Sequence, residues 1–118
     1  MKWTLIICIL LCVSCAGHKP LTKGQIAGEV AWEGLHLIDW GQTLNIASNP
    51  NYYEKNFILG RHPSRGAVNI YMLGFAIAHP IITYLLPDKW RKYWIGASLV
   101  GTGFWVVRNH SIGLRPKF

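Results

Sequence analysis

Carboxylates and catalytic motifs are scarce in this sequence. The chain has five Asp and Glu residues against twelve Lys and Arg, which gives its 118 residues a formal net charge of +7. It contains no arrangement of Ser, His and Asp that is typical of a catalytic triad, no glycine-rich phosphate loop and no pair of Cys-x-x-Cys motifs. We therefore expect neither an enzyme nor a cofactor.

The sequence also gives little support for a metal site. Glu33-x-x-His36 matches the spacing that di-iron helical bundles use, but such sites need this element twice, with further carboxylates from facing helices. The sequence offers it once. We therefore expect no metal ion, and we expect the polar residues near Glu33 to form a solvated face of a helix.

The excess of positive charge favours a membrane over nucleic acid. Half of the chain is apolar, and its six Trp and five Tyr tend to lie near cations that are scattered singly between hydrophobic runs. Aromatic rings and long cationic side chains both settle at the headgroup level of a bilayer. We expect a lipid bilayer as a partner and no nucleic acid.

Residues 1–14 read as a signal peptide. Lys2 precedes an apolar stretch from Thr4 to Val13, and small residues follow it. The uncharged stretch is shorter than the roughly 20 residues that a spanning helix needs. An ordinary signal peptide cut near Gly17 and an uncleaved amino-terminal anchor remain alternatives.

The three cysteines all lie in this first segment. The order Leu11-Cys12-Val13-Ser14-Cys15 resembles a bacterial lipobox, which implies that Cys15 is acylated and becomes the new amino terminus. Residues 15–24 would then be a lipid-anchored linker, followed by one helical membrane-associated domain over residues 25–118.

The domain is expected to be all-α. Residues 25–47 form an amphipathic pattern, with one apolar face and an opposite polar arc. The apolar face contains Ile26, Val30, Leu37 and Leu44, and the polar arc contains Glu29, Glu33, His36, Asp39 and Thr43. We expect this helix to pack on another element or on the membrane.

Two apolar runs follow and predict an antiparallel helical hairpin. Residues 66–87 carry no charge and are long enough to cross a bilayer core of about 30 Å. Residues 93–107 form a second, shorter uncharged run, which could span or lie re-entrant, and Pro87-Asp88-Lys89 provides the turn. Ser64 is the expected N-cap of the first helix. Both helices could instead form the core of a soluble bundle.

Small residues suggest how this hairpin packs. Gly74 and Ala78 on the first helix, with Ala97 and Gly101 on the second, have the four-residue spacing that allows close approach in lipid. If the amino terminus is exported, the loop around Lys89 would face the cytoplasm.

One group of polar residues is a possible functional cluster. His79 precedes Pro80 inside the first apolar run, and ionisable groups within a membrane are functional candidates. Structural roles are the alternative. The candidates are Glu33, His36, Asp39, His62 and His79.

Between Trp32 and Gly113 the chain resembles a group of small membrane-associated proteins of bacteriophages and proteobacteria that has no established activity. The resemblance implies the architecture and a phage origin. It rests on Asp39-x-x-Gln42-Thr43, Asn56-x-x-Leu59-Gly60-x-His62-Pro63-Ser64, Leu86-Pro87, and Asn109 with Ile112-Gly113.

We therefore expect a small bacterial or phage-encoded lipoprotein of the cell envelope, in the inner membrane rather than the outer. It would act without catalysis by contacting other membrane proteins, for example in superinfection exclusion or envelope assembly. No small-molecule substrate is identified from the sequence. The alternative is a membrane-embedded enzyme or transport component that uses the His and Asp residues of the polar cluster.

Overall fold

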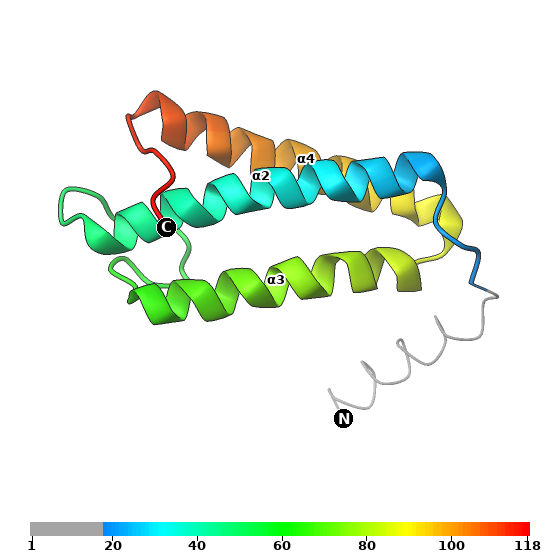
Figure 1. Ribbon diagram of the computed structural model, residues 1–118, viewed down its shortest axis with the longest axis horizontal. Coiled ribbons are helices and arrows are strands. Elements are labelled where there is room, and N and C mark those ends of the chain that lie inside the picture. The colour runs from blue at the N-terminus through cyan, green and yellow to red at the C-terminus, as the bar shows by residue number, and fades with distance from the viewer. Residues whose placement is uncertain (1–17) are drawn as a thin grey trace.

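The computed structural model describes residues 18–118, which form three helices (Figure 1): α2 (Lys23–Ser48), α3 (Arg65–Leu85) and α4 (Asp88–Ser111). The all-α prediction is confirmed. The expected signal peptide and the lipobox-like cysteine, Cys15, lie outside the described residues.

The helix ends follow from local side chains. Thr22 accepts a hydrogen bond from the backbone N–H of Gln25, and the Gln25 side chain accepts one from Thr22 in return, which makes a capping box for α2. Ser64 accepts from the backbone N–H of Ala67 and caps α3, as predicted. The chain turns from α3 into α4 at Leu86 and Pro87.

The central helix of the bundle is α2. It packs extensively on α4 and also on α3, whereas α3 and α4 contact each other little although they are consecutive. The predicted packing through small residues is wrong, because a Cβ atom added at Gly74 or Gly101 would meet nothing within 4 Å. Aromatic rings such as that of Trp94, which stacks on His79, separate α3 from α4 instead.

Close helix contact occurs at glycines of α2. A Cβ atom at Gly28 would lie 2.7 Å from Cγ2 of Ile95 on α4, and one at Gly41 would lie 2.7 Å from Cβ of Pro116 in the carboxyl-terminal segment. These two glycines therefore let α4 and the end of the chain approach the α2 backbone.

The buried face of α2 contains polar side chains beside apolar ones such as Trp32 and Leu44, and other apolar side chains of the helix are exposed. Apolar Val30 is 68% exposed, whereas Glu29 and His36 are only 7% and 5% exposed. The prediction of a solvated polar face is thus wrong for Glu29 and His36, because these side chains find partners on α3. In α3 Ile70 is exposed and Thr83 is completely buried, and the apolar Val68 and Met72 are buried as well.

In the described part of the chain, one helix, α3, is long and apolar enough to cross a membrane by length and composition. Its 21 residues extend about 31 Å at about 1.5 Å per residue, which matches a bilayer core of about 30 Å.

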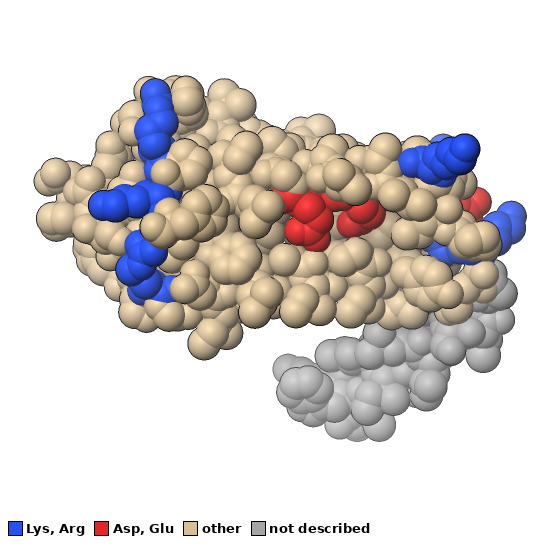
Figure 2. Space-filling view, viewed as in Figure 1, with Lys and Arg blue, Asp and Glu red and all other residues tan. Residues whose placement is uncertain are grey.

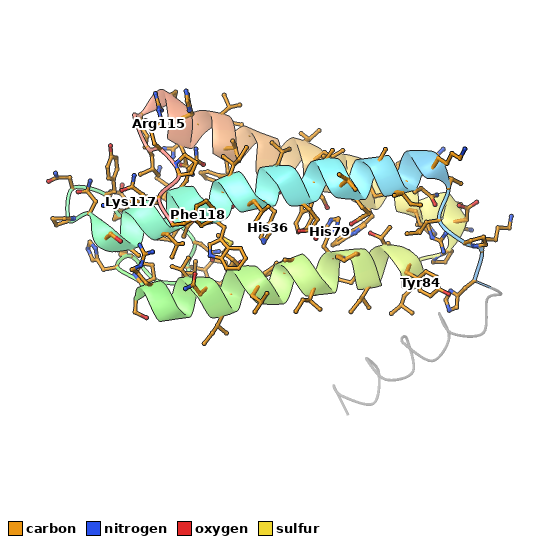
Figure 3. The ribbon with its side chains drawn as sticks, viewed as in Figure 1. His36, His79, Tyr84, Arg115, Lys117 and Phe118 are labelled. Carbon is orange, nitrogen blue, oxygen red and sulfur yellow. The ribbon has the colours of Figure 1, made fainter. Side chains whose placement is uncertain are left out.

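The first described residues lie at the same end of the bundle as the turn between α3 and α4. The ring of His18 stacks on Tyr84 at a centroid distance of 5.5 Å, and Arg91 donates a hydrogen bond to the carbonyl of Pro20. Residues 18–20 and the loop around Lys89 therefore lie at the same end of the bundle, and an orientation with these two segments on opposite sides of a membrane does not fit this arrangement. The chain ends at the opposite end of the bundle (Figure 3).

Candidate functional site

A buried polar cluster joins the amino-terminal half of α2 to α3. Nδ1 of His79 lies 2.9 Å from Oε2 of Glu29, and the hydroxyl of Thr83 donates to Oε1 of the same carboxylate. His79 is 3% exposed and Thr83 is fully buried. An ionised carboxylate away from water needs such partners, because its desolvation is costly. The cluster therefore fixes the register of α2 against α3.

Four rings form a column beside this cluster. Trp32 stacks on His79 with centroids 3.6 Å apart and on His36 with centroids 4.7 Å apart, and Trp94 of α4 covers His79 at 4.8 Å. The indole N–H of Trp32 donates to the hydroxyl of Thr102 on α4. The column thus holds side chains of all three helices together, and Figure 3 shows His36 and His79 lying in the space between α2 and α3.

Two polar atoms of this column have no hydrogen-bond partner. Among residues 18–118, Nε2 of His79 and Nε1 of Trp94 are the buried side-chain nitrogen and oxygen atoms left unpaired. The other buried polar groups of the column are bonded; for example, Nε2 of His36 lies 2.9 Å from the carbonyl oxygen of Met72. Unpaired buried atoms are uncommon in native proteins and call for an explanation.

Both residues line a partly open cavity of ≈ 690 Å³, to which all three helices and the segment between α2 and α3 contribute. Arg108, at the other limit of the cavity, lies fourteen residues after Trp94, which is about 21 Å along α4 at about 1.5 Å per residue. The cavity therefore runs from the middle of the bundle to one end. Its aromatic lining includes Trp32, Tyr71, Phe75, Trp94 and Trp105.

The structure brings together only part of the predicted polar cluster. His36, Asp39 and His79 line the cavity, whereas Glu33 is half-buried on α2 outside the lining and His62 is exposed in the segment between α2 and α3. Glu33 and His62 are therefore not part of this site.

Sequence reasoning missed Glu29 and Thr83 as site residues. Glu29 shares the polar arc of His36, and Thr83 follows His79 by four residues, which places both on one helix face. That spacing could have indicated Thr83. No comparable spacing in the sequence indicates that Trp32 stacks on His79. In the part of the chain that is described, no group of three or more His, Cys, Asp or Glu residues could hold a metal ion.

Three polar residues of the stretch that resembles phage proteins make structural contacts. Gln42 is fully buried and donates to the carbonyl of Val106 on α4, and Asn109 donates to its side-chain oxygen. Asn56 donates to the hydroxyl of Tyr71. These side chains link the helices to one another and to the connecting segment.

Comparisons of the chain with known protein families, curated proteins and solved structures find no match. The arrangement of the site itself therefore has to support any functional conclusion. Its features are a paired carboxylate and histidine, stacked indoles and a cavity that reaches one end of the bundle.

Proposed function

We propose that this protein is a small bacterial or phage-encoded lipoprotein whose three helices cross the inner membrane and which acts by binding, without catalysis. The observation that carries the proposal is the burial of polar side chains beneath a surface that is rich in exposed apolar side chains. The centre of the bundle contains Glu29, His79 and Thr83, while its surface exposes apolar side chains of every helix. Lipid solvates such a surface and water does not.

The distribution of charge supports the same placement. Figure 2 shows Lys and Arg at the two ends of the long axis, with no cation on the middle of the visible face. No Lys or Arg occurs between Lys23 and Lys55, between Arg65 and Lys89, or between Lys92 and Arg108. Asp and Glu side chains are visible in the middle of that face in Figure 2. The cations at both ends of the bundle fit the two headgroup layers of a bilayer.

Aromatic side chains mark one of these layers. Tyr84, Trp90 and Tyr93 are exposed near the turn between α3 and α4. Trp and Tyr are enriched at the membrane–water interface. Acylation of Cys15 would attach a lipid on the amino-terminal side of the same end.

A lipid on Cys15 fixes the proposed orientation. The amino-terminal end of the bundle would face outward, α2 would run inward, α3 outward and α4 inward, and the carboxyl end would be cytoplasmic. The exposed helix faces would then be available to other membrane proteins, as superinfection exclusion or envelope assembly requires.

Two experiments test this proposal. Metabolic labelling with a palmitate analogue should label the wild type and not Cys15→Ala. In a variant with no other accessible cysteine, Lys19→Cys should react with an impermeant maleimide in spheroplasts and Lys117→Cys only after lysis. Release of the protein by alkaline carbonate without detergent would contradict membrane insertion.

A second candidate function is a membrane-embedded enzyme or transport component. The buried pair of Glu29 and His79 beside the cavity favours it, because intramembrane ionisable residues often lie on substrate or proton paths. It requires that His36→Ala and His79→Ala abolish the phenotype that the protein confers while its abundance stays unchanged. A fall in abundance alone would instead indicate structural roles.

A further inference from the structure

The carboxylate of Asp39 has no partner of opposite charge. One ion pair occurs among residues 18–118, between Glu29 and His79, and no hydrogen bond in this part of the chain involves the Asp39 side chain. Glu54 is near enough to repel it. Asp39 is half-buried, and no partner offsets the cost of its desolvation. A polar group that stays at such a cost to stability calls for an explanation, and function is a common one.

The carboxylate of Asp39 is open to the cavity. Nε2 of His79 and Nε1 of Trp94 are the unpaired side-chain atoms of residues 18–118 that water cannot reach. The oxygens of Asp39 are not among them, so water-sized molecules reach this carboxylate. Trp32, Asp39 and Ile46 follow one another at intervals of seven residues, which places them on one face of α2, and all three line the cavity.

Aromatic rings of α3 lie level with Asp39. Nε2 of His36 lies 2.9 Å from the carbonyl oxygen of Met72, which follows Tyr71 in the sequence. Asp39 follows His36 by three residues, which is about 4.5 Å along α2 at about 1.5 Å per residue. The ring of Tyr71 lies 4.9 Å from that of Phe75, and both residues line the cavity. Two rings are therefore available within about one turn of Asp39.

A ring of α4 lies at a similar level. Gln42 donates a hydrogen bond to the carbonyl of Val106, which follows Trp105, and Asp39 precedes Gln42 by three residues. Trp105 also lines the cavity. The face of an aromatic ring attracts a cation, and the attraction increases where water is excluded. A carboxylate among rings of two other helices therefore favours an organic cation as the ligand.

Two cations of the protein also line the cavity, but neither neutralises Asp39. Lys55 is exposed in the segment between α2 and α3, and the guanidinium carbon of Arg108 lies 5.5 Å from the ring centroid of Trp105. Neither side chain forms an ion pair with a carboxylate. The cavity volume of ≈ 690 Å³ falls within the range of about 300–1,000 Å³ that is usual for small-molecule sites. The cavity thus has room for a ligand that carries its own positive charge.

We propose that this cavity binds a hydrophobic organic cation, an amine or a quaternary ammonium attached to an aromatic group, with its charge beside Asp39 and its apolar part among the rings. Asp39 contacts the ligand, and Glu54 adds to the negative potential at the site. The site does not depend on the proposed membrane location, because the folded bundle itself supplies every group that the ligand contacts.

Calorimetric titration of the full-length protein in a non-ionic detergent tests the site. The probe is benzyltrimethylammonium, and the matched control ligand is phenylmethanesulfonate, which has the same ring and a head group of similar size but opposite charge. We expect saturable one-to-one binding of the ammonium ion and binding of the sulfonate that is weaker by at least about tenfold.

Two variants separate ligand binding from folding. Asp39→Asn removes the charge and keeps the size of the side chain, so it should weaken binding of the ammonium ion by at least about tenfold. Its thermal unfolding temperature should be no lower than that of the wild type, because the lost charge is unpaired and repelled by Glu54. Glu33→Gln makes the same chemical change on α2 outside the cavity and should bind the ammonium ion like the wild type.

Three results would each overturn the proposal: no saturable binding of the ammonium ion, equal affinity for the ammonium ion and the sulfonate, or equal affinity of Asp39→Asn and the wild type. A marked fall in the unfolding temperature of Asp39→Asn would overturn it as well, because the carboxylate would then be structural. The titration is made in detergent, so its failure is distinguishable from that of the carbonate and labelling tests, which address the membrane location.

Discussion

Glu29 and His79 lie fifty residues apart in the sequence, yet Oε2 of the carboxylate is 2.9 Å from Nδ1 of the imidazole in the centre of the bundle. This pair explains why the polar arc of α2 faces inward. A carboxylate and an imidazole that bond each other are more easily accommodated inside the protein than either group is without a partner. The apolar residues on the other side of α2 are consequently turned outward.

Loss of this carboxylate should destabilise the protein strongly. Glu29→Leu removes the partner of Nδ1 of His79 and leaves this buried atom unpaired, whereas the Thr83 hydroxyl keeps its hydrogen bond to the carbonyl of His79. We expect the free energy of unfolding to fall by about 3 kcal/mol, measured by titration with SDS of the detergent-solubilised protein. Glu33→Leu, on the same helix but outside the cluster, should cost less than half as much. Equal losses would show that the pair contributes nothing specific.

Replacement by alanine should change the free energy of unfolding in opposite directions at two glycines of α2, Gly28 and Gly34. Gly28→Ala brings a methyl group against Ile95, which should cost about 1–3 kcal/mol of unfolding free energy. Gly34→Ala meets open space and should stabilise the helix by up to about 1 kcal/mol. Thermal unfolding in detergent measures both. Because Ile95→Ala is itself destabilising at this buried position, the test is a double-mutant cycle. Gly28→Ala should cost less in an Ile95→Ala background than in the wild type if the clash is the cause, and an equal cost would contradict the proposed contact.

The helices could be predicted from the sequence, because their boundaries depend on local signals. The expected first helix, residues 25–47, differs from α2 by two residues at its start and one at its end. Ser64 was identified as a cap from its position before the apolar run. Asn109 and Gln42 lie on separate helices, however, and no spacing in the sequence indicates that their side chains bond.

The cavity and the burial of Glu29 could not be predicted, for a physical reason. An apolar stripe shows that a helix has two faces, but the same stripe packs on protein in water and faces lipid in a membrane. The column of rings needs Trp32, His79 and Trp94 from three different helices. Its assembly depends on tertiary packing, which hydrophobic periodicity does not encode.

The cap of α3 should contribute measurably to stability. Ser64 accepts from the backbone N–H of Ala67 at 3.1 Å, so Ser64→Ala should lower the free energy of unfolding by about 1 kcal/mol. Ser64→Asp retains an acceptor and should remain close to the wild type. Unfolding monitored by circular dichroism compares the three proteins, and identical curves would mean that the cap is not needed.

A charge on the outer face of α3 distinguishes a lipid-facing surface from a water-facing one. Ile77 is 55% exposed near the middle of α3, so in a bilayer Ile77→Lys places an ammonium group in hydrocarbon, at a cost of about 3 kcal/mol for insertion. We expect the membrane-inserted fraction, measured by carbonate extraction and flotation, to fall severalfold. Phe57→Lys makes the same kind of change at an exposed site in the segment between α2 and α3, where cations already occur, and should leave that fraction unchanged. In water the argument reverses, because an exposed isoleucine replaced by lysine improves solubility without loss of folding. An Ile77→Lys protein that is abundant, folded and recovered without detergent would therefore exclude the proposed membrane placement of α3.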